Sequence, residues 1–180
     1  MKLLMLAGTA EARALAAKLD RDGRIDLTVS LAGATQSPLP LEGKLRVGGF
    51  GGEREQEKFI FDNGFDAVID ATHPFAARIS ARTSDICRGL AVPYLGLLRP
   101  AWQPGPGDDW RSVATEAEVA EEVAQDDVVF LGTGPGSLDA IGPLDARRVL
   151  CPVVMIDRPA PPAGDRVETV DQALDWVNRL

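Results

Sequence analysis

Apolar positions in the first half of the chain follow two alternating patterns. After Lys2, residues 2–7 (KLLMLA) form an apolar run, which is typical of a strand buried on both faces of a sheet. Residues 10–20 (AEARALAAKLD) repeat apolar side chains every three or four positions, which predicts an amphipathic helix. The same alternation then predicts strands at residues 27–32, 67–71 and 92–97, and helices at residues 53–62 and from Pro74, at the first helical position, to about Gly89.

Strands alternating with helices at this spacing predict a parallel sheet with right-handed crossovers. The expected fold class is therefore α/β, with a Rossmann-like parallel-sheet domain over residues 1–98. Residues 99–110 (RPAWQPGPGDDW) contain three prolines and two glycines, and they predict a linker. The alternation resumes more weakly over residues 111–180, which predicts a second, truncated α/β module with helices at 116–124 and 170–178 and strands at 128–131 and 153–156.

Charge and composition argue against several classes of protein. The chain carries 27 acidic against 19 basic residues, a net charge of -8, whereas a nucleic-acid-binding protein would carry a basic stripe. No segment is long and apolar enough to predict a membrane span. The apolar start is broken at Gly8 and passes into a helix without a cleavage site, so we expect a cytoplasmic protein. Cys87 and Cys151 form neither a disulfide framework nor a metal site.

Ligands of an open parallel sheet bind at the carboxyl ends of the strands, so the segments that follow the predicted strands are the candidate site. Gly8 and Thr9 follow the first strand: the glycine allows close backbone approach, and the threonine either caps the helix or donates to a phosphate. A complete G-x-G-x-x-G fingerprint is absent. Residues 32–35 (AGAT), after the second strand, lack the acidic residue that selects NAD, which favours NADP, although a cation for the 2′-phosphate is also missing.

A glycine-rich loop occupies residues 47–52 (VGGFGG), with four glycines around Phe50. A strand would not tolerate four glycines, and a surface loop would not need the phenylalanine. A loop that lies against a flat ligand explains both features.

His73 is the only histidine of the chain and lies where the strand at residues 67–71 ends. Asp70 stands inside that apolar strand, and Thr72 follows it. A helix beginning at Pro74 would disfavour the imidazolium form, so we expect His73 to be a neutral hydrogen-bonding group, and a purely structural role stays open. Without a second histidine, a nearby cysteine or clustered carboxylates, no metal site is expected; a G-x-S-x-G elbow of a serine hydrolase is also absent.

Together these segments resemble one family, the precorrin-6A reductases of cobalamin biosynthesis. The order and spacing of the matching segments agree over the whole first half of the chain. They are LAGTAEARALA at residues 6–16, VSLAGATQSPLP at 29–40, RVGGFGG at 46–52, VIDATHPFAARIS at 68–80, VPYLGLLRPAW at 92–102 and PVVMIDRPAPP at 152–162.

The resemblance implies an NADPH-dependent oxidoreductase that acts on a CH–CH group, with neither a metal nor a flavin. It would transfer hydride to the macrocycle of precorrin-6A, a small tetrapyrrole, and give precorrin-6B. Asp70 and His73 are the candidate catalytic residues. The implied cofactor-binding residues are Gly8, Thr9, Gly48, Gly49, Phe50, Gly51, Thr72, His73 and Pro74. The implied substrate-binding residues are Phe75, Arg78, Arg82 and Arg99, the arginines as partners of the substrate carboxylates.

Three departures from the family pattern qualify this expectation. The family usually has arginine at the position of Ala34, so NADP preference depends on compensation by Arg13 or Arg46. Gly134, Pro135 and Gly136 replace a family G-R-Q segment. A long family stretch that includes K-N-S-G-G is missing between Cys151 and Pro152, which predicts a second domain that is cut short.

Two alternative functions stay open on the sequence alone. A chain without the missing stretch could be a degenerate nucleotide-binding module that lacks reductase activity. Residues 131–140 (LGTGPGSLDA) also resemble the G-x-G-P-G loop of tetrapyrrole methyltransferases, which bind S-adenosylmethionine.

Overall fold

The computed structural model describes residues 1–33, 41–122 and 153–180, and it divides the chain into two compact units. Unit 1 comprises Met1–Pro100 together with Pro159–Leu180, and unit 2 comprises Ala101–Arg158. The chain therefore leaves unit 1 after its fifth strand and returns to it for the last 22 residues.

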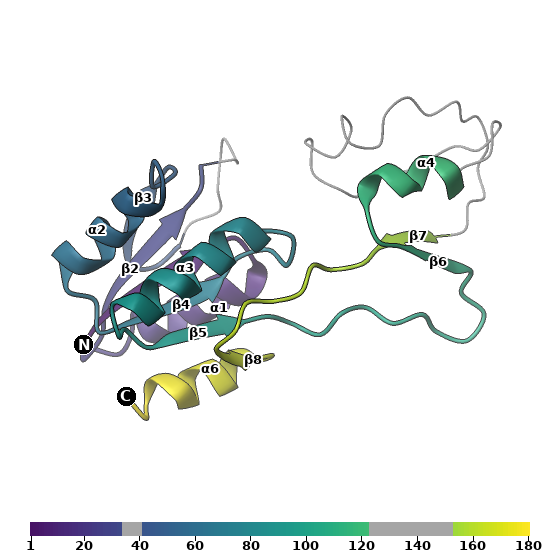
Figure 1. Cartoon of the computed structure of the whole chain (residues 1–180). Helices are drawn as coiled ribbons and strands as arrows, with labels where there is room; N and C mark the ends of the chain where they lie inside the picture. Colours follow the sequence, from purple (N-terminus) through teal and green to yellow (C-terminus); the bar gives the residue numbers. More distant parts are fainter. Residues whose placement is uncertain (34–40, 123–152) are drawn as a thin grey trace. The chain divides into compact units, whose positions relative to one another are not determined.

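Unit 1 is built on a six-stranded sheet in which all neighbouring strands are parallel (Figure 1). The strand order is β3-β2-β1-β4-β5-β8, which is the Rossmann order 3-2-1-4-5-6 with β8 in the sixth place. The strands are β1 (Lys2–Ala7), β2 (Asp26–Leu31), β3 (Lys44–Val47), β4 (Ala67–Ala71), β5 (Tyr94–Leu97) and β8 (Asp165–Val167). The α/β fold class with a Rossmann-like parallel sheet is confirmed.

Helices cover both faces of this sheet, and each face has its own apolar core. The core on one face joins α1 (Ala10–Leu19) and α6 (Val170–Val177) to the sheet, with Leu15 and Ala173 fully buried. The core on the other face joins α2 (Glu53–Asn63) and α3 (Ala77–Gly89), through Ile60, Ile86 and their neighbours. Burial on both faces explains why β1 and β4 are apolar apart from Lys2 and Asp70.

The predicted boundary between the modules differs from the observed division. The sequence assigned residues 111–180 to the second module, whereas Pro159–Leu180 pack in unit 1. β8 pairs with β5 in parallel, and Lys18 of α1 forms an ion pair with Asp171 of α6 over 2.7 Å. The amphipathic face of α6 thus covers apolar surface of the first sheet, a pairing between segments too distant in sequence for local patterns to indicate.

The other differences in unit 1 concern short elements. β3 was not predicted, because four residues at the sheet edge, with Leu45 and Val47 more than half exposed, carry no buried apolar run. α3 begins at Ala77 and not at Pro74. Pro74 lies instead in a turn closed by the Ala76 N–H and the His73 carbonyl over 2.8 Å, a position that suits its fixed φ.

Unit 2 contains a second parallel pair of strands, β6 (Trp110–Val113) and β7 (Val153–Ile156). The short helices η1 (Glu116–Glu118) and α4 (Val119–Glu122) follow β6, where the sequence predicted a helix over 116–124. Val113 and Val119 form its small core with Val154 and Ile156. β7 confirms the predicted strand at 153–156, whereas the predicted strand at 128–131 lies outside the described residues.

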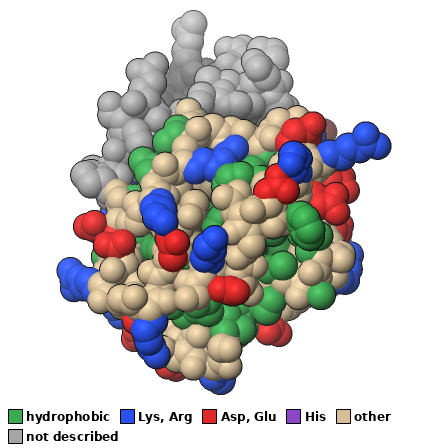
Figure 2. Space-filling view, turned by 90° about the vertical axis from the view of Figure 1, so that its left-hand side faces the viewer, with side chains coloured by type: hydrophobic (Ala, Val, Ile, Leu, Met, Phe, Trp, Pro, Cys, Tyr) green, Lys and Arg blue, Asp and Glu red, His purple; other side chains and the backbone are tan. Residues whose placement is uncertain are grey.

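Surface charge on unit 1 is mixed in sign. Figure 2 shows Lys and Arg side chains interspersed with Asp and Glu over one face of the molecule. Exposed ion pairs of unit 1 include Lys58 with Asp62 on α2 and Lys44 with Asp26. Among the described residues, no helix has the length and apolarity that crossing a membrane requires.

Candidate functional site

The carboxyl ends of β1 and β4 form the point at which the strand order of unit 1 reverses. From β1 the chain runs through α1 on one face of the sheet to β2, whereas from β4 it runs through α3 on the other face to β5. Ala7 and Ala71, the last residues of the two strands, are register partners. Crevices at such reversal points hold the ligands of open α/β sheets, so this edge is the candidate site.

Gly8 lies directly against the segment that follows β4. A Cβ atom at position 8 would stand 3.6 Å from the His73 backbone nitrogen and 3.7 Å from the Thr72 Cα. A larger side chain would therefore fill the space between the two strand ends. The structure brings together Gly8, Thr72 and His73, three residues that the sequence analysis singled out separately.

Thr9 uses its hydroxyl inside the protein. It is the N-cap of α1, where Oγ1 accepts the Ala12 N–H over 3.1 Å and donates to the Ala71 carbonyl over 3.0 Å. Of the two alternatives that the sequence left open, the structure favours helix capping, because the single hydroxyl proton is already committed. Of the first-turn N–H groups of α1, that of Ala12 is satisfied by Thr9; unbonded N–H groups at the start of a helix are general donors for anions.

Arg46 braces the glycine loop. Its guanidinium donates to the carbonyls of Gly48 and Gly49 over 2.5 and 2.9 Å, and to the Ser30 hydroxyl over 3.1 Å. Partial burial lowers the pKa of Arg46 below its ordinary value, although a guanidinium stays charged at any physiological pH. Arg46 was a candidate cation for the 2′-phosphate on the sequence alone, whereas these contacts give it a structural role in holding the loop.

Phe50 anchors the same loop to α2. The Arg46 guanidinium carbon lies 4.0 Å from the centroid of the Phe50 ring, whose centroid is 5.5 Å from that of Phe59 on α2. Packing within the protein therefore accounts for a phenylalanine among glycines, which the sequence attributed to a flat ligand. A Cβ at Gly48 or Gly49 would meet no atom of the described residues within 4 Å, and the φ of +119° at Gly48 favours glycine.

Asp70 is buried, with 6% of its surface exposed, and accepts three hydrogen bonds. Oδ1 accepts from the Thr72 N–H over 3.0 Å and the Thr72 hydroxyl over 2.7 Å, while Oδ2 accepts from the Tyr94 hydroxyl over 2.9 Å. Both carboxylate oxygens are therefore occupied by donors within the protein. This geometry fits a carboxylate that holds its neighbours in place better than one that exchanges protons with a ligand.

His73 and Phe75 present aromatic side chains at the candidate site. Their ring centroids lie 5.7 Å apart with nearly parallel planes, and Phe75 is 45% exposed. The Phe75 N–H donates to His73 Nδ1 over 3.4 Å, which puts the proton of a neutral ring on Nε2. Because α3 begins only at Ala77, His73 lies outside its first turn, and the helix-dipole argument made from the sequence was wrong.

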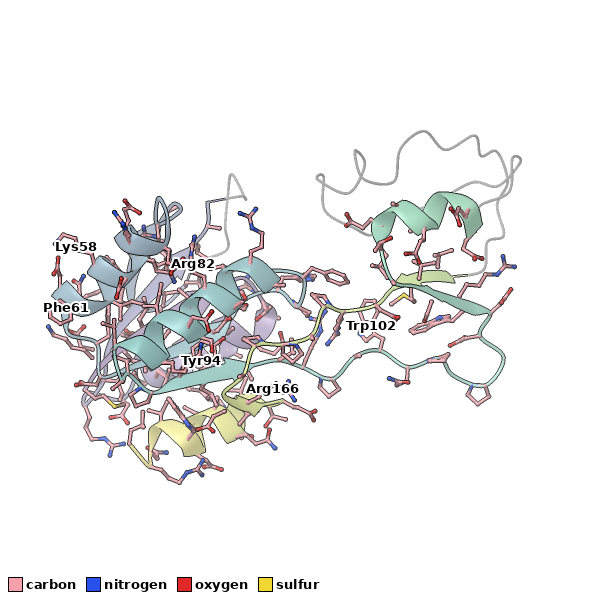
Figure 3. All side chains as sticks on the ribbon, in the orientation of Figure 1. Lys58, Phe61, Arg82, Tyr94, Trp102 and Arg166 are labelled. Carbon is pink, nitrogen blue, oxygen red and sulfur yellow. The ribbon has the colours of Figure 1, made fainter. Side chains whose placement is uncertain are left out.

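The predicted substrate arginines lie in different environments. Arg82 of α3 is partly buried and donates through Nε to Gln56 Oε1 over 2.6 Å (Figure 3), and Gln56 in turn donates to Thr83 over 2.7 Å. Arg78 is exposed near the start of α3. Arg99 follows β5, and its guanidinium lies 3.9 Å from Glu11 in the first turn of α1. Of the three arginines predicted to bind substrate, Arg99 is the one linked by this ion pair to the helix that follows β1.

Sequence reasoning missed Tyr94 and Ser80. Tyr94 is in a strand whose pattern indicates only burial, and Ser80 is one of several small polar residues of α3. Their contacts with Asp70 and Thr72 come from adjacent elements in the folded unit. No spacing rule in the sequence indicates them.

Several sequence predictions lie outside the described residues: those on Ala34, on residues 131–140, on Gly134–Gly136 and on Cys151. Within the described parts of the chain, no group of three or more His, Cys, Asp or Glu side chains is placed to hold a metal ion.

The family model described as precorrin-6x reductase CbiJ/CobK matches residues 2–150. A precorrin-6A reductase from Sinorhizobium sp is 45% identical over 117 residues, which cover 65% of this chain and 45% of that protein. A solved structure described as CobK precorrin-6A reductase has a TM-score of 0.85 and 26% identity, and the match covers 99% of this chain and 96% of that one.

The alignment with a longer relative can be compared with the stretch that the sequence predicted to be missing from the second module. A precorrin-6A reductase from Rhodobacter capsulatus is 29% identical over 240 residues, covering 98% of this chain and 95% of that protein. That alignment is longer than the 180 residues of this chain, so an internal part of the relative has no counterpart here. The family match ends at residue 150, beside the predicted position of the missing stretch.

This chain spans about half the length of the Sinorhizobium relative. The family match nevertheless covers most of the chain, and it includes the β1 end, the glycine loop and the segment after β4. The chain belongs to the precorrin-6x reductase family CbiJ/CobK.

Proposed function

We propose that the chain reduces the precorrin-6A macrocycle to precorrin-6B with NADPH, as a step of corrin-ring biosynthesis. The observation that carries this proposal is the contact of Gly8 with Thr72 and His73 at the reversal point of a Rossmann-ordered sheet. Family membership supports the choice of cofactor and substrate. The reductase activity is itself part of the proposal, because the match covers only 45% of the Sinorhizobium relative.

The residues at the carboxyl edge fit a dinucleotide. Gly8 keeps the β1–α1 turn free of a side chain, and the first-turn N–H groups of α1 supply donors for a phosphate. Gly48 and Gly49 leave room for a ligand beside the loop after β3, because among residues 1–33, 41–122 and 153–180 a Cβ at either position would meet no atom within 4 Å. Gly51 has a φ of +90° and shapes the same loop. Thr9 contributes by fastening this turn to the β4 end.

Residues after β4 would form the wall between cofactor and substrate. Thr72, His73 and Pro74 follow the strand, and the half-exposed ring of Phe75 offers a flat apolar surface for a macrocycle. Arg78, Arg82 and Arg99 are the proposed partners of the substrate carboxylates, since guanidinium groups bind carboxylates through paired hydrogen bonds. Arg82 is already oriented by Gln56.

NADPH, when bound, supplies the hydride, so the chain needs no nucleophile of its own. We assign His73 to positioning through hydrogen bonds, with Nδ1 turned toward the Phe75 N–H and Nε2 as the donor. Asp70 has no proton-transfer role in this proposal, since its three protein donors occupy both oxygens. Asp70 therefore acts by holding Thr72.

Anaerobic turnover of purified precorrin-6A with NADPH, followed at the nicotinamide absorbance, tests the proposed function. We expect oxidation of one NADPH for each precorrin-6B formed. Separate titrations with NADPH, NADH and S-adenosylmethionine should detect binding of the nicotinamide cofactors only. Tight binding of S-adenosylmethionine without NADPH binding would overturn the proposal.

A second candidate function follows from the size of the chain, which covers 45% of its Sinorhizobium relative. It is a nucleotide-binding module that holds NADPH on unit 1 and lacks turnover. The same experiments separate the two functions, because this module would bind NADPH with unchanged nicotinamide absorbance in the presence of substrate.

A further inference from the structure

A chain of hydrogen bonds connects β5, β4 and α3 at the candidate site. The Tyr94 hydroxyl, on β5, donates to Asp70 Oδ2 over 2.9 Å. Asp70 Oδ1, on β4, accepts both the backbone N–H and the hydroxyl of Thr72. The Thr72 hydroxyl lies 3.2 Å from the Ser80 hydroxyl on α3, and Ser80 is the donor there because the Thr72 proton points to Asp70.

Every donor to Asp70 in this chain of contacts is neutral. Within the described part of the chain, the carboxylate accepts from two hydroxyls and one amide and from no cation. At 6% exposure it has little access to water. A buried carboxylate loses much of its stabilisation when one donor is removed. The Tyr94 hydroxyl is thus a large part of what fixes the position of Asp70.

Tyr94 is suited to this role because its hydroxyl keeps its proton. Burial, and then the Asp70 carboxylate, raise the pKa of Tyr94 well above its ordinary value. Figure 3 shows Tyr94 on β5 under α3, and its ring packs with the apolar core on that face of the sheet. Tyr94 is therefore a permanent donor held in place by its own packing.

We propose that Tyr94 is a positioning residue of the candidate site, which acts through Asp70 to hold Thr72 and the adjoining His73 backbone against Gly8. The proposal rests on the proposed function for its ligand, NADPH, and on the geometry alone for its effect on Thr72. Asp70 makes an Asx-type turn with the Thr72 N–H, so a shift of the carboxylate shifts the backbone that faces Gly8.

Tyr94→Phe removes the donor and keeps the ring. We expect hydrogen exchange of the Thr72 amide to accelerate by about tenfold, as for loss of a hydrogen bond to a charged group. NADPH affinity should fall about fivefold, because the wall opposite Gly8 becomes mobile. The effects of Tyr94→Phe and Thr72→Val on NADPH affinity should be non-additive, since both break the same chain of contacts.

Ser84→Ala is the matched control. Ser84 lies on α3, as Ser80 does, is buried, and donates to the Ala163 carbonyl over 2.7 Å, outside this chain of contacts. It should lower stability like any lost buried hydrogen bond and leave both Thr72 exchange and NADPH affinity within about twofold of wild type. Unchanged Thr72 exchange in Tyr94→Phe, or equal acceleration in Ser84→Ala, would overturn the proposal.

A second measurement does not depend on the folding of Tyr94→Phe. Tyr94 is the only tyrosine of the chain, so fluorotyrosine incorporation labels this position alone. Its fluorine resonance should shift on Thr72→Val and not on Ser84→Ala, and the reverse pattern would count against the proposal. Failure of wild-type protein to bind NADPH would refute the proposed function and leave the exchange and fluorine results to decide the role of Tyr94.

Discussion

The Thr9 hydroxyl donates to the Ala71 carbonyl over 3.0 Å, across 62 positions of sequence. The same oxygen accepts the Ala12 N–H at the start of α1. One side chain therefore caps the helix that follows β1 and fastens that turn to the end of β4, the two strand ends between which the sheet order reverses.

Replacing Thr9 by valine should remove both bonds with little change of shape. We expect the free energy of unfolding to fall by about 2 kcal/mol, from one helix cap and one buried hydrogen bond. Thr9→Ser keeps the hydroxyl and should stay within about 0.5 kcal/mol of wild type. Urea denaturation of the three proteins measures the difference, and equal losses for valine and serine would argue against a role for the hydroxyl.

Gly49→Val should weaken NADPH binding by at least about tenfold, because the added side chain projects into the open space beside the loop. The fold should tolerate it, since the φ of Gly49 is not positive and a Cβ there meets no atom within 4 Å in the part of the chain that the structure describes. Gly23→Val is the matched control. Gly23 lies in the turn that joins α1 to β2, and a Cβ there also meets no atom of the described residues within 4 Å. Unchanged affinity in a folded Gly49→Val protein would remove the loop from the site.

Cofactor preference depends on the cation available for the 2′-phosphate. We expect only a modest preference for NADPH over NADH, since position 34 is alanine and Arg46 donates to loop carbonyls. Ala34→Arg should raise NADPH affinity by about 1–3 kcal/mol through a paired guanidinium–phosphate contact, with no gain for NADH. Titration with both cofactors tests this, and a preference above about a hundredfold in the unmodified chain would identify another cation, such as Arg13.

His73→Gln should retain much of the reduction rate, because glutamine keeps a side-chain donor and acceptor, whereas His73→Ala should lose more. The expectation follows from a ring that accepts the Phe75 N–H at Nδ1 and stacks on the Phe75 side chain. An obligatory proton donor would give a different result. Both variants would then fall by about 10²–10⁴-fold, and the wild-type rate would follow one ionisation near neutral pH.

Stability should decline at alkaline pH because of Cys87. Burial, and then the charge of Asp70, raise the pKa of this thiol from 9.0 to about 12. Between these values the unfolded thiol has lost its proton and the folded one has kept it. The free energy of unfolding therefore falls as pH rises, by at most about 1.4 kcal/mol per pH unit. Cys87→Ala should flatten this slope in denaturant titrations from pH 9 to 11, and an unchanged slope would assign the decline to Tyr94.

Local pattern was sufficient for the elements that are long or buried on both faces. The strands β1 and β4 and the helices α1 and α2 begin and end within about two residues of the sequence-based expectation, since their apolar periodicity reports burial directly. The order of the sheet followed in part from the same alternation, because strand–helix–strand units impose parallel pairing and one crossover hand.

Local pattern did not predict the short edge strands or the packing of segments that are far apart in the sequence. β3 and β8 have four and three residues, and each lies at an edge of the sheet, where half of the backbone needs no partner strand. The return of α6 to unit 1 depends on an apolar face that fits α1 and the sheet, and periodicity indicates such a face without indicating its partner.

The sequence by itself determined which residues stand at strand ends, and therefore that Gly8, the glycine loop and His73 belong to one edge of the sheet. Tertiary structure alone decided what each side chain does there. Thr9 caps and fastens, Arg46 braces the loop, and Asp70 is held by Tyr94 from the next strand. The physical reason is that hydrogen bonds depend on positions within a few tenths of an ångström, which arise only when elements far apart in the chain pack together.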